Sequence, residues 1–247
     1  RLTMKSLIQT EFLKFKRSRI LYISIFGVLI ISATVLLQGQ HIFYGEKYAD
    51  KSGWLITAAL SLGSFYILPP LFALIGSYSI SREYQDGTMK ELAIIPVRGK
   101  ELIVSKLIVS FTFCIFLTLL LFVLELFTEV ILYTNKLTIL EMIGYLKQYF
   151  LQGIALFFAI TPLIAIVTIF RKGYWLSVIF AMIYSFAGVF TSQSQMFKSI
   201  YPISASFCFS GFYDVSGMQF MIACISLIIS LLIAGIILRS ARVYRME

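Results

Sequence analysis

Residues 81–106 read SREYQDGTMKELAIIPVRGKELIVSK and lie between two long apolar runs, at 54–80 and 102–124. Each run reaches the roughly 20 residues that a helix needs to cross a bilayer. A polar stretch placed between two such runs predicts a loop that leaves the membrane, faces water and returns. Through such a loop a membrane protein can contact a soluble partner.

This loop is predicted to contain a short helix. Thr88 and Glu91 are three residues apart ahead of Leu92 and Ile95, so Thr88 can cap the first amides while Glu91 reaches back. Pro96 then ends the helix after about two turns, because proline cannot continue the hydrogen-bond ladder.

The composition assigns the chain to a membrane. Of its 247 residues, 59% are hydrophobic and only 13% are charged, which is more apolar surface than a soluble domain of this length can bury. The net charge of +9 comes from Lys and Arg scattered over short segments, so it does not indicate nucleic acid. Three cysteines are an odd number and predict no disulfide framework.

The hydrophobic pattern predicts an all-α membrane protein, with residues 1–247 forming a single transmembrane domain. An amphipathic helix at 4–19 is expected to lie along the membrane surface, and the segment 81–101 forms the water-exposed loop. The six expected spans are about 20–37, 54–80, 102–124, 148–170, 174–190 and 218–238.

Lys and Arg set the expected orientation. All but five of the 21 Lys and Arg residues fall in segments on one side of the six spans, and the five exceptions are Lys47, Lys51, Lys136, Lys147 and Lys198. The positive-inside rule therefore predicts that both termini and the 81–101 loop are cytoplasmic. The alternative is a miscounted span with inverted ends.

The connection at 191–217 differs from the other outer connections. It is rich in Phe and Tyr and is interrupted by Pro202 and Gly211, so it is too short and broken for a normal span. Aromatic residues at this density are typical of the membrane interface. The segment is predicted to be re-entrant from the outer side.

No catalytic constellation or metal site is recognisable. The only histidine, His41, lies in the first outer loop with no second His or Cys nearby, which disfavours a metal site and an intramembrane protease. No GxxxxGK[ST] motif is present, since Gly99-Lys100 lacks both the earlier glycine and the following hydroxyl. If ATP drives this protein, another polypeptide hydrolyses it, and no cofactor is expected in this chain.

Glu125 and Glu129 are the most unusual charges, because they are one turn apart just after a long apolar stretch. If the third span ends near Leu124, they are ordinary carboxylates at the outer interface. If the helix continues to Tyr133, they lie in the outer leaflet and should face the protein interior, since charge at membrane depth is costly.

The loop resembles the cytoplasmic signature of ABC-2 type transporter permeases. The matching positions are Glu83, Gly87, Thr88, Leu92, Pro96, Val97, Ser105 and Lys106. The resemblance extends over essentially the whole chain and is greatest to small permeases of bacterial peptide-antibiotic exporters, including the lantibiotic-immunity and bacitracin-resistance groups.

The resemblance implies an exporter subunit in the bacterial cell membrane that moves a peptide or amphipathic antimicrobial. In that family the loop helix docks onto a separate ATPase subunit, which binds ATP and Mg. Two ATPase copies and a second permease chain, identical or related, are the expected partners, besides membrane lipid. The residues expected to bind the ATPase are Glu83, Asp86, Gly87, Thr88, Met89, Lys90, Glu91, Leu92 and Pro96.

A substrate path is expected near the outer leaflet, where carboxylates and aromatic faces would attract cationic amphipathic peptides. Its expected residues are Glu125, Glu129, Phe207, Phe212 and Asp214. Two other classes stay open at this point: a six-span substrate-capture subunit of an importer or a channel-like protein, and an intramembrane enzyme, which the absence of catalytic motifs disfavours.

Overall fold

The computed structural model describes residues 3–43, 46–47, 51–85, 87, 99–132, 137–170 and 173–240. These residues form a helical bundle with one small antiparallel hairpin, in which Ile42 is opposite Lys47. The elements are α1 Met4–Lys16, α2 Arg19–Gly39, β1 Ile42–Phe43, β2 Glu46–Lys47, α3 Trp54–Leu62, the π-helix η2 Gly63–Ile67, α4 Leu68–Gln85, α6 Gly99–Leu132, α7 Ile139–Phe170, α8 Trp175–Ser192, the 3-10 helix η3 Phe197–Ser199, α9 Pro202–Ser210 and α10 Gly217–Ser240.

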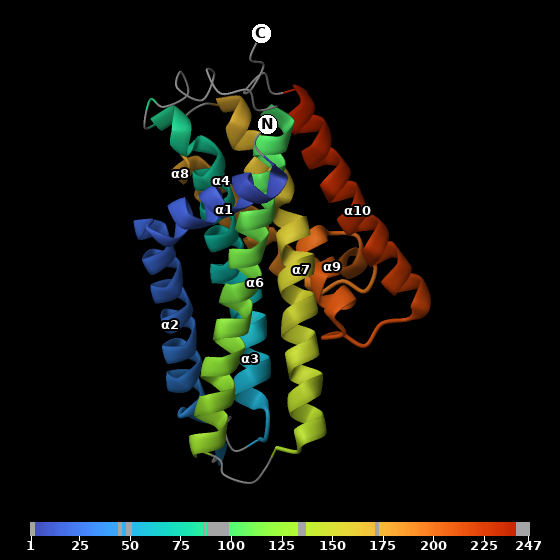
Figure 1. Cartoon of the computed structure of the whole chain (residues 1–247). Helices are drawn as coiled ribbons and strands as arrows, with labels where there is room; N and C mark the ends of the chain where they lie inside the picture. Colours follow the sequence, from blue (N-terminus) through green and yellow to red (C-terminus); the bar gives the residue numbers. More distant parts are fainter. Residues whose placement is uncertain are drawn as a thin grey trace.

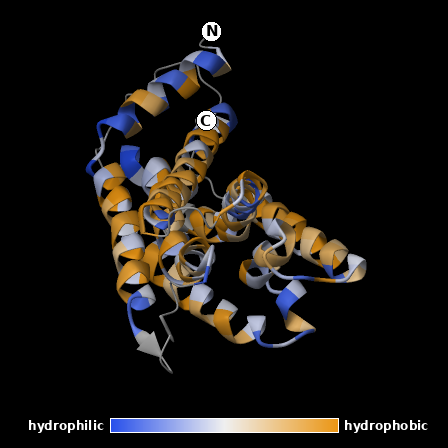
Figure 2. Cartoon of the chain, turned by 90° about the horizontal axis from the view of Figure 1, so that it is seen from below, coloured by the Kyte–Doolittle hydropathy of each residue, from blue (hydrophilic) through white to orange (hydrophobic). Residues whose placement is uncertain are grey.

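The predicted all-α fold with six spans is confirmed at the level of length and composition. Within the described residues, the helices apolar and long enough to cross a membrane are Arg19–Gly39, Trp54–Glu83, Gly99–Leu132, Ile139–Ile166, Trp175–Ser192 and Gly217–Arg239. Figure 1 shows these helices gathered into one bundle, and Figure 2 shows that most of their residues are hydrophobic.

The two ends of the bundle differ in the elements that they hold. At one end α1 lies across the bundle, α4 ends and α6 begins (Figure 1). We call it the basic end, because Lys14, Arg82 and Lys106 lie there. The opposite end holds the hairpin, the start of α3 and the point where α6 ends and α7 begins.

Helix α1 begins and ends with ordinary local signals. The hydroxyl of Thr3 accepts a hydrogen bond from the Ser6 N–H. At the start of α2 the hydroxyl of Ser18 accepts a hydrogen bond from the Ile20 N–H. Leu7 and Phe15 are buried on the side of α1 that packs against α6. A location of α1 at the membrane surface stays a prediction.

The third and fourth spans are longer than expected. The predicted end at 124 is too early, because α6 continues without interruption to Leu132. Helix α7 begins at Ile139, and not at 148, because Thr138 and Glu141 form a capping box: the Thr138 N–H donates to Glu141 at 2.8 Å, and the Glu141 N–H donates back to the Thr138 hydroxyl at 3.4 Å.

The second span contains a π-helical turn, η2, that prolines help to explain. Pro69 has no N–H, so the carbonyl four residues earlier, on Phe65, loses its normal donor. The hydroxyl of Ser185 in α8 donates to that carbonyl instead. The irregular turn therefore becomes a point of attachment between two spans, as expected for π-bulges and proline-containing membrane helices.

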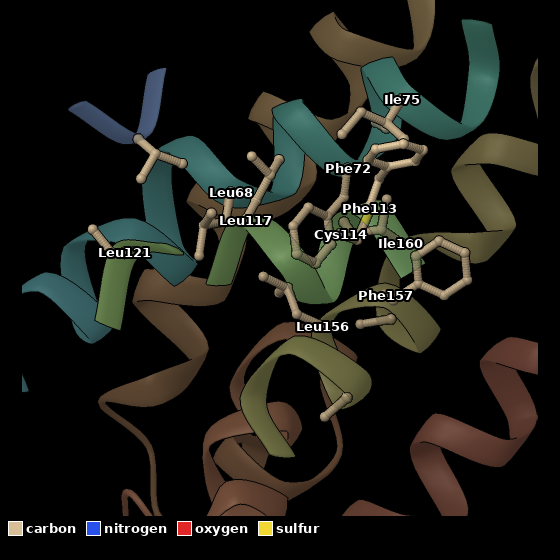
Figure 3. Close-up of a cluster of buried hydrophobic side chains, with 14 of the residues drawn as sticks. Leu68, Phe72, Ile75, Phe113, Cys114, Leu117, Leu121, Leu156, Phe157 and Ile160 are labelled. Carbon is tan, nitrogen blue, oxygen red and sulfur yellow. The ribbon is translucent and has the colours of Figure 1, made fainter. Parts of the chain in front are cut away.

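The hydrophobic core lies where α4, α6 and α7 meet (Figure 3). Phe72 of α4, Leu117 of α6 and Ile160 of α7 are each fully buried there. Gly76 of α4 allows α7 to approach closely, because a Cβ at that position would collide with the side chain of Ile164. Small residues that permit close helix packing are typical of membrane bundles.

Helix α9 lies about halfway along α6 and α7 in Figure 1, beside α7 and α10. Gly211 ends it in the left-handed conformation at φ +76°, which glycine adopts at no steric cost. Gln152 of α7 donates to Ser206 at 2.9 Å, and Gln148 donates to the Gly211 carbonyl at 3.1 Å. These contacts anchor α9 on α7, and a re-entrant position in the membrane stays a prediction.

Candidate functional site

A buried ion cluster joins three helices at the basic end of the bundle. Lys106 of α6 extends its Nζ to the carboxylate of Glu83 of α4, at 2.5 Å, and to that of Glu11 of α1, at 3.3 Å. The exposed fractions are 0% for Lys106, 3% for Glu83 and 5% for Glu11. All three charges are therefore shielded from solvent, although they come from distant parts of the sequence.

Each of the three N–H donors of the Lys106 ammonium has an acceptor in the cluster. A lysine ammonium has three N–H donors. Besides the two carboxylates, Lys106 Nζ donates to the Ser79 carbonyl at 2.6 Å. Three acceptors for three donors is the arrangement that a buried ammonium needs, because an unmatched charge in a medium of low dielectric is strongly unfavourable.

Lys14 and Arg82 lie at the solvent-facing side of the buried ions. Lys14, whose side chain is 40% exposed, lies 2.7 Å from Glu11 and 3.5 Å from Glu83. Burial lowers the pKa of the Lys14 ammonium, but the two carboxylates raise it by more, so the net shift is upward. Arg82 donates to the Lys14 carbonyl at 3.1 Å and lies over the Tyr78 ring. The two lysines balance the charges of the two glutamates, so Glu11, Lys14, Glu83 and Lys106 together have no net charge.

The pair of Glu83 and Lys106 joins the two ends of the predicted water-exposed loop at 81–101. Glu83 is near the end of α4 and Lys106 is in the first turns of α6, so their contact closes the segment between them. Glu83, which was expected to contact the ATPase, is buried and its carboxylate pairs with Lys106. A contact of Glu83 with the ATPase stays a prediction. Ser105 is buried too, and its hydroxyl donates to the Leu102 carbonyl at 2.8 Å.

Most of the predicted ATPase-binding residues lie outside the described residues. These are Asp86, Thr88, Met89, Lys90, Glu91, Leu92 and Pro96. Gly87 is described: it is exposed and has φ +69°, a left-handed conformation that favours glycine. The short capped helix and its binding to an ATPase stay predictions.

The opposite end contains the two glutamates of α6, and both are buried. Glu125 is 0% exposed and Glu129 is 1% exposed, so the second of the two placements considered from the sequence, a continuing helix with inward-facing carboxylates, describes this chain. Glu129 accepts a hydrogen bond of 2.8 Å from the N–H of Gly53, the residue that precedes α3. That a substrate path passes these carboxylates stays a prediction.

The aromatic residues expected beside that path belong largely to the protein interior. Phe207 is 0% exposed and stacks on Phe65, with 4.4 Å between ring centroids. Phe212 packs against Phe207 at 5.3 Å, whereas Asp214 is exposed. Phe207 and Phe212 thus belong to the packing of α9 and the turn that follows it.

Comparison with known proteins identifies the family. A family model described as ABC-2 family transporter protein matches residues 7–188. The bacitracin transport permease protein BCRB of Bacillus licheniformis is 35% identical to this chain over 162 residues, which are 66% of this chain and 73% of the relative. The chain belongs to the ABC-2 transporter family.

This ABC-2 permease is thus a membrane protein and the transmembrane component of a transporter. The matched range contains Glu11, Glu83 and Lys106 as well as both buried glutamates, and it ends before α9. The ion cluster and the carboxylates of α6 are therefore parts of the region that the permease shares with its family.

Two members of the ion cluster, Glu11 and Lys14, were missed from the sequence. The signal was present: Leu7, Glu11 and Phe15 are spaced four apart, so a carboxylate lies in the apolar stripe of α1. A charge in the buried face of an amphipathic helix indicates a partner inside the protein. The sequence does not say which of 21 cationic side chains that partner is.

Proposed function

We propose that this chain is the permease subunit of an ABC exporter that moves a peptide or amphipathic antimicrobial out of the membrane or the cell. The printed name of the bacitracin transport permease, together with 35% identity, supports a substrate of this kind. Separate ATPase subunits, two copies, bind ATP and Mg and drive the transport. A second permease chain, identical or related, completes the assembly.

The observation that carries the proposal is the buried cluster of Glu11, Glu83 and Lys106, in which Glu83 and Lys106 come from the two ends of the loop. A partner that pushes on the loop moves the end of α4 and the start of α6 together, because the ion pair joins them. The contact of Lys106 with Glu11 passes the same movement to α1. ATP-driven docking can thereby tilt three helices as one rigid body.

The basic end faces the cytoplasm in this proposal. The positive-inside rule places the Lys- and Arg-rich segments there, and the ATP that drives transport is on the same side. The bacterial plasma membrane is the corresponding location. The ATPase meets the loop between α4 and α6 from the cytoplasm, and the ion cluster joins the two spans that this loop connects.

Deleting Met89 to Ile95 tests the proposal. The deletion should abolish resistance to the transported antimicrobial and uncouple ATP hydrolysis from its presence, without preventing membrane insertion. Bulky apolar residues at Gly87 and Thr88 should have the same effect. Growth in the antimicrobial and the ATPase activity of the purified complex are the two measurements.

A matched control is Lys51→Ala, an exposed position at the opposite end, which should leave both readouts unchanged. Copurification of the tagged variants with the ATPase separates loss of docking from loss of transport. Full assembly together with full resistance after the deletion would remove the loop from the mechanism.

A further inference from the structure

Glu125 is fully buried at the opposite end of the bundle. Ser32 of α2 and Tyr149 of α7 lie beside its carboxylate. From Lys106 to Glu125, α6 rises about 28 Å at about 1.5 Å per residue, close to the roughly 30 Å of a bilayer's hydrocarbon core. If Lys106 marks one boundary of that core, Glu125 lies near the other.

Neither carboxylate oxygen of Glu125 accepts a hydrogen bond of normal geometry from the described residues. The Ser32 hydroxyl is near enough to interact with the carboxylate. The Tyr149 hydroxyl cannot supply a donor, because its proton is directed to the Ile56 carbonyl at 2.6 Å. Lys51 and Lys147, whose side chains are described at this end, are exposed. Glu125 is thus a fully buried carboxyl group without a cationic partner among the described side chains.

Glu129, one turn further along α6, has a different environment. Its carboxylate accepts the Gly53 N–H at the start of α3, and the positive end of a helix dipole favours an anion there. Tyr145 of α7 lies close enough to interact with the charge of Glu129. A backbone donor and a helix terminus make Glu129 the member of the pair that can hold a negative charge.

Two carboxylates one turn apart do not both ionise readily when both are buried. The charge of the second must be cancelled by a proton or by a metal cation. Among the described residues no group of three or more His, Cys, Asp or Glu side chains could hold a metal ion. A proton needs neither additional ligands nor space.

We propose that Glu125 is a proton-binding site, carried as the neutral carboxylic acid beside an ionised Glu129. The neutral acid is compatible with the close packing of α2, α6 and α7 around it. An ionised Glu125 would need water or a cation between these helices, so loss of the proton would loosen this end of the bundle. The proposal concerns the resting permease and does not depend on its substrate.

Infrared spectroscopy of the full-length protein in lipid nanodiscs at neutral pH tests the assignment. The expected spectrum contains a carbonyl band of a buried protonated carboxylic acid that shifts in D₂O. That band should disappear in Glu125→Gln and persist in Glu129→Gln. Absence of the band from the wild type, its persistence in Glu125→Gln, or its loss in Glu129→Gln alone would each overturn the proposal.

Thermal unfolding gives a second readout that does not require assigned bands. Gln has the shape of a protonated Glu, so Glu125→Gln should unfold at the wild-type temperature or above it, whereas Glu129→Gln, which loses an ionised acceptor, should unfold earlier. If Glu125→Gln unfolds markedly earlier than the wild type, Glu125 is ionised and paired, and the proposal fails. Glu125→Asp preserves the acid and should keep the infrared band even if packing is weakened.

Discussion

Lys106 shows at the scale of one residue what a buried charge requires. Its ammonium has three acceptors, Glu83, Glu11 and the Ser79 carbonyl, and no solvent exposure. The attraction within such a cluster largely offsets the cost of removing the charges from water. The cluster therefore fixes the relative positions of three helices more than it adds to stability, and removing one member leaves the others uncompensated.

Replacing Lys106 with Met should reduce the free energy of unfolding by about 3–5 kcal/mol, the usual cost of breaking a buried ion pair on one side. The measurement is the unfolding transition of the purified permease in detergent. Changing Glu11 and Glu83 to Gln in the same chain should recover most of the loss, because no buried member of the cluster is then charged and Lys14 is exposed enough to be solvated.

Lys14→Met is the matched control, because Lys14 contacts the same carboxylates but is 40% exposed. It should cost at most about 1 kcal/mol, as exposed ion pairs do. Equal losses for Lys14→Met and Lys106→Met would contradict the role assigned to the buried cluster.

At the scale of an element, the second span illustrates how a broken helix is repaired by a neighbour. Pro69 removes an N–H from the ladder, and Ser185 of α8 donates to the Phe65 carbonyl that has lost it. A carbonyl without a donor in a membrane interior is costly, so the α8 hydroxyl is part of the structure of the second span. The two spans are thereby held in one register.

Ser185→Ala should lower the free energy of unfolding by about 1–3 kcal/mol, because the Phe65 carbonyl is left without a donor. In a Pro69→Ala background the restored N–H can serve that carbonyl, so the cost of Ser185→Ala should become smaller. A double-mutant cycle on detergent-solubilised protein measures the difference. Strictly additive losses would show that the two positions do not share this carbonyl.

At the scale of the whole molecule, the distribution of charge sets the orientation. The basic end collects Lys and Arg, and at the opposite end the two carboxylates of α6, Glu125 and Glu129, are buried. Because cytoplasmic loops are enriched in Lys and Arg, the basic end is expected inside the cell.

Single-cysteine labelling of intact cells checks this orientation. On a background without Cys114, Cys208 and Cys224, a cysteine at position 90 should be protected from an impermeant thiol reagent. Cysteines at positions 41, 136 and 198 should react from outside. Reaction of position 90 in unbroken cells would invert or refute the six-span topology.

The number and approximate position of the spans could be predicted from the amino-acid sequence, because the free energy of placing a helix in a bilayer is largely a sum over its own residues. Residues 81–106 also indicated the family, through Glu83, Gly87 and the Ser105-Lys106 pair. The end of the third span could not be predicted in this way, because the sequence does not show whether water or protein surrounds Glu125 and Glu129.

The pairing of the buried charges depends on how the helices pack against one another. Glu11 and Lys106 are 95 residues apart in sequence and 3.3 Å apart in space, and no local pattern encodes that pairing. Glu83 and Lys106 both belong to the family signature, but they pair only because α4 and α6 pack side by side. Burial of a charge depends on packing between helices, whereas insertion of a helix depends on its own composition, and for this reason the spans were predictable and the ion cluster was not.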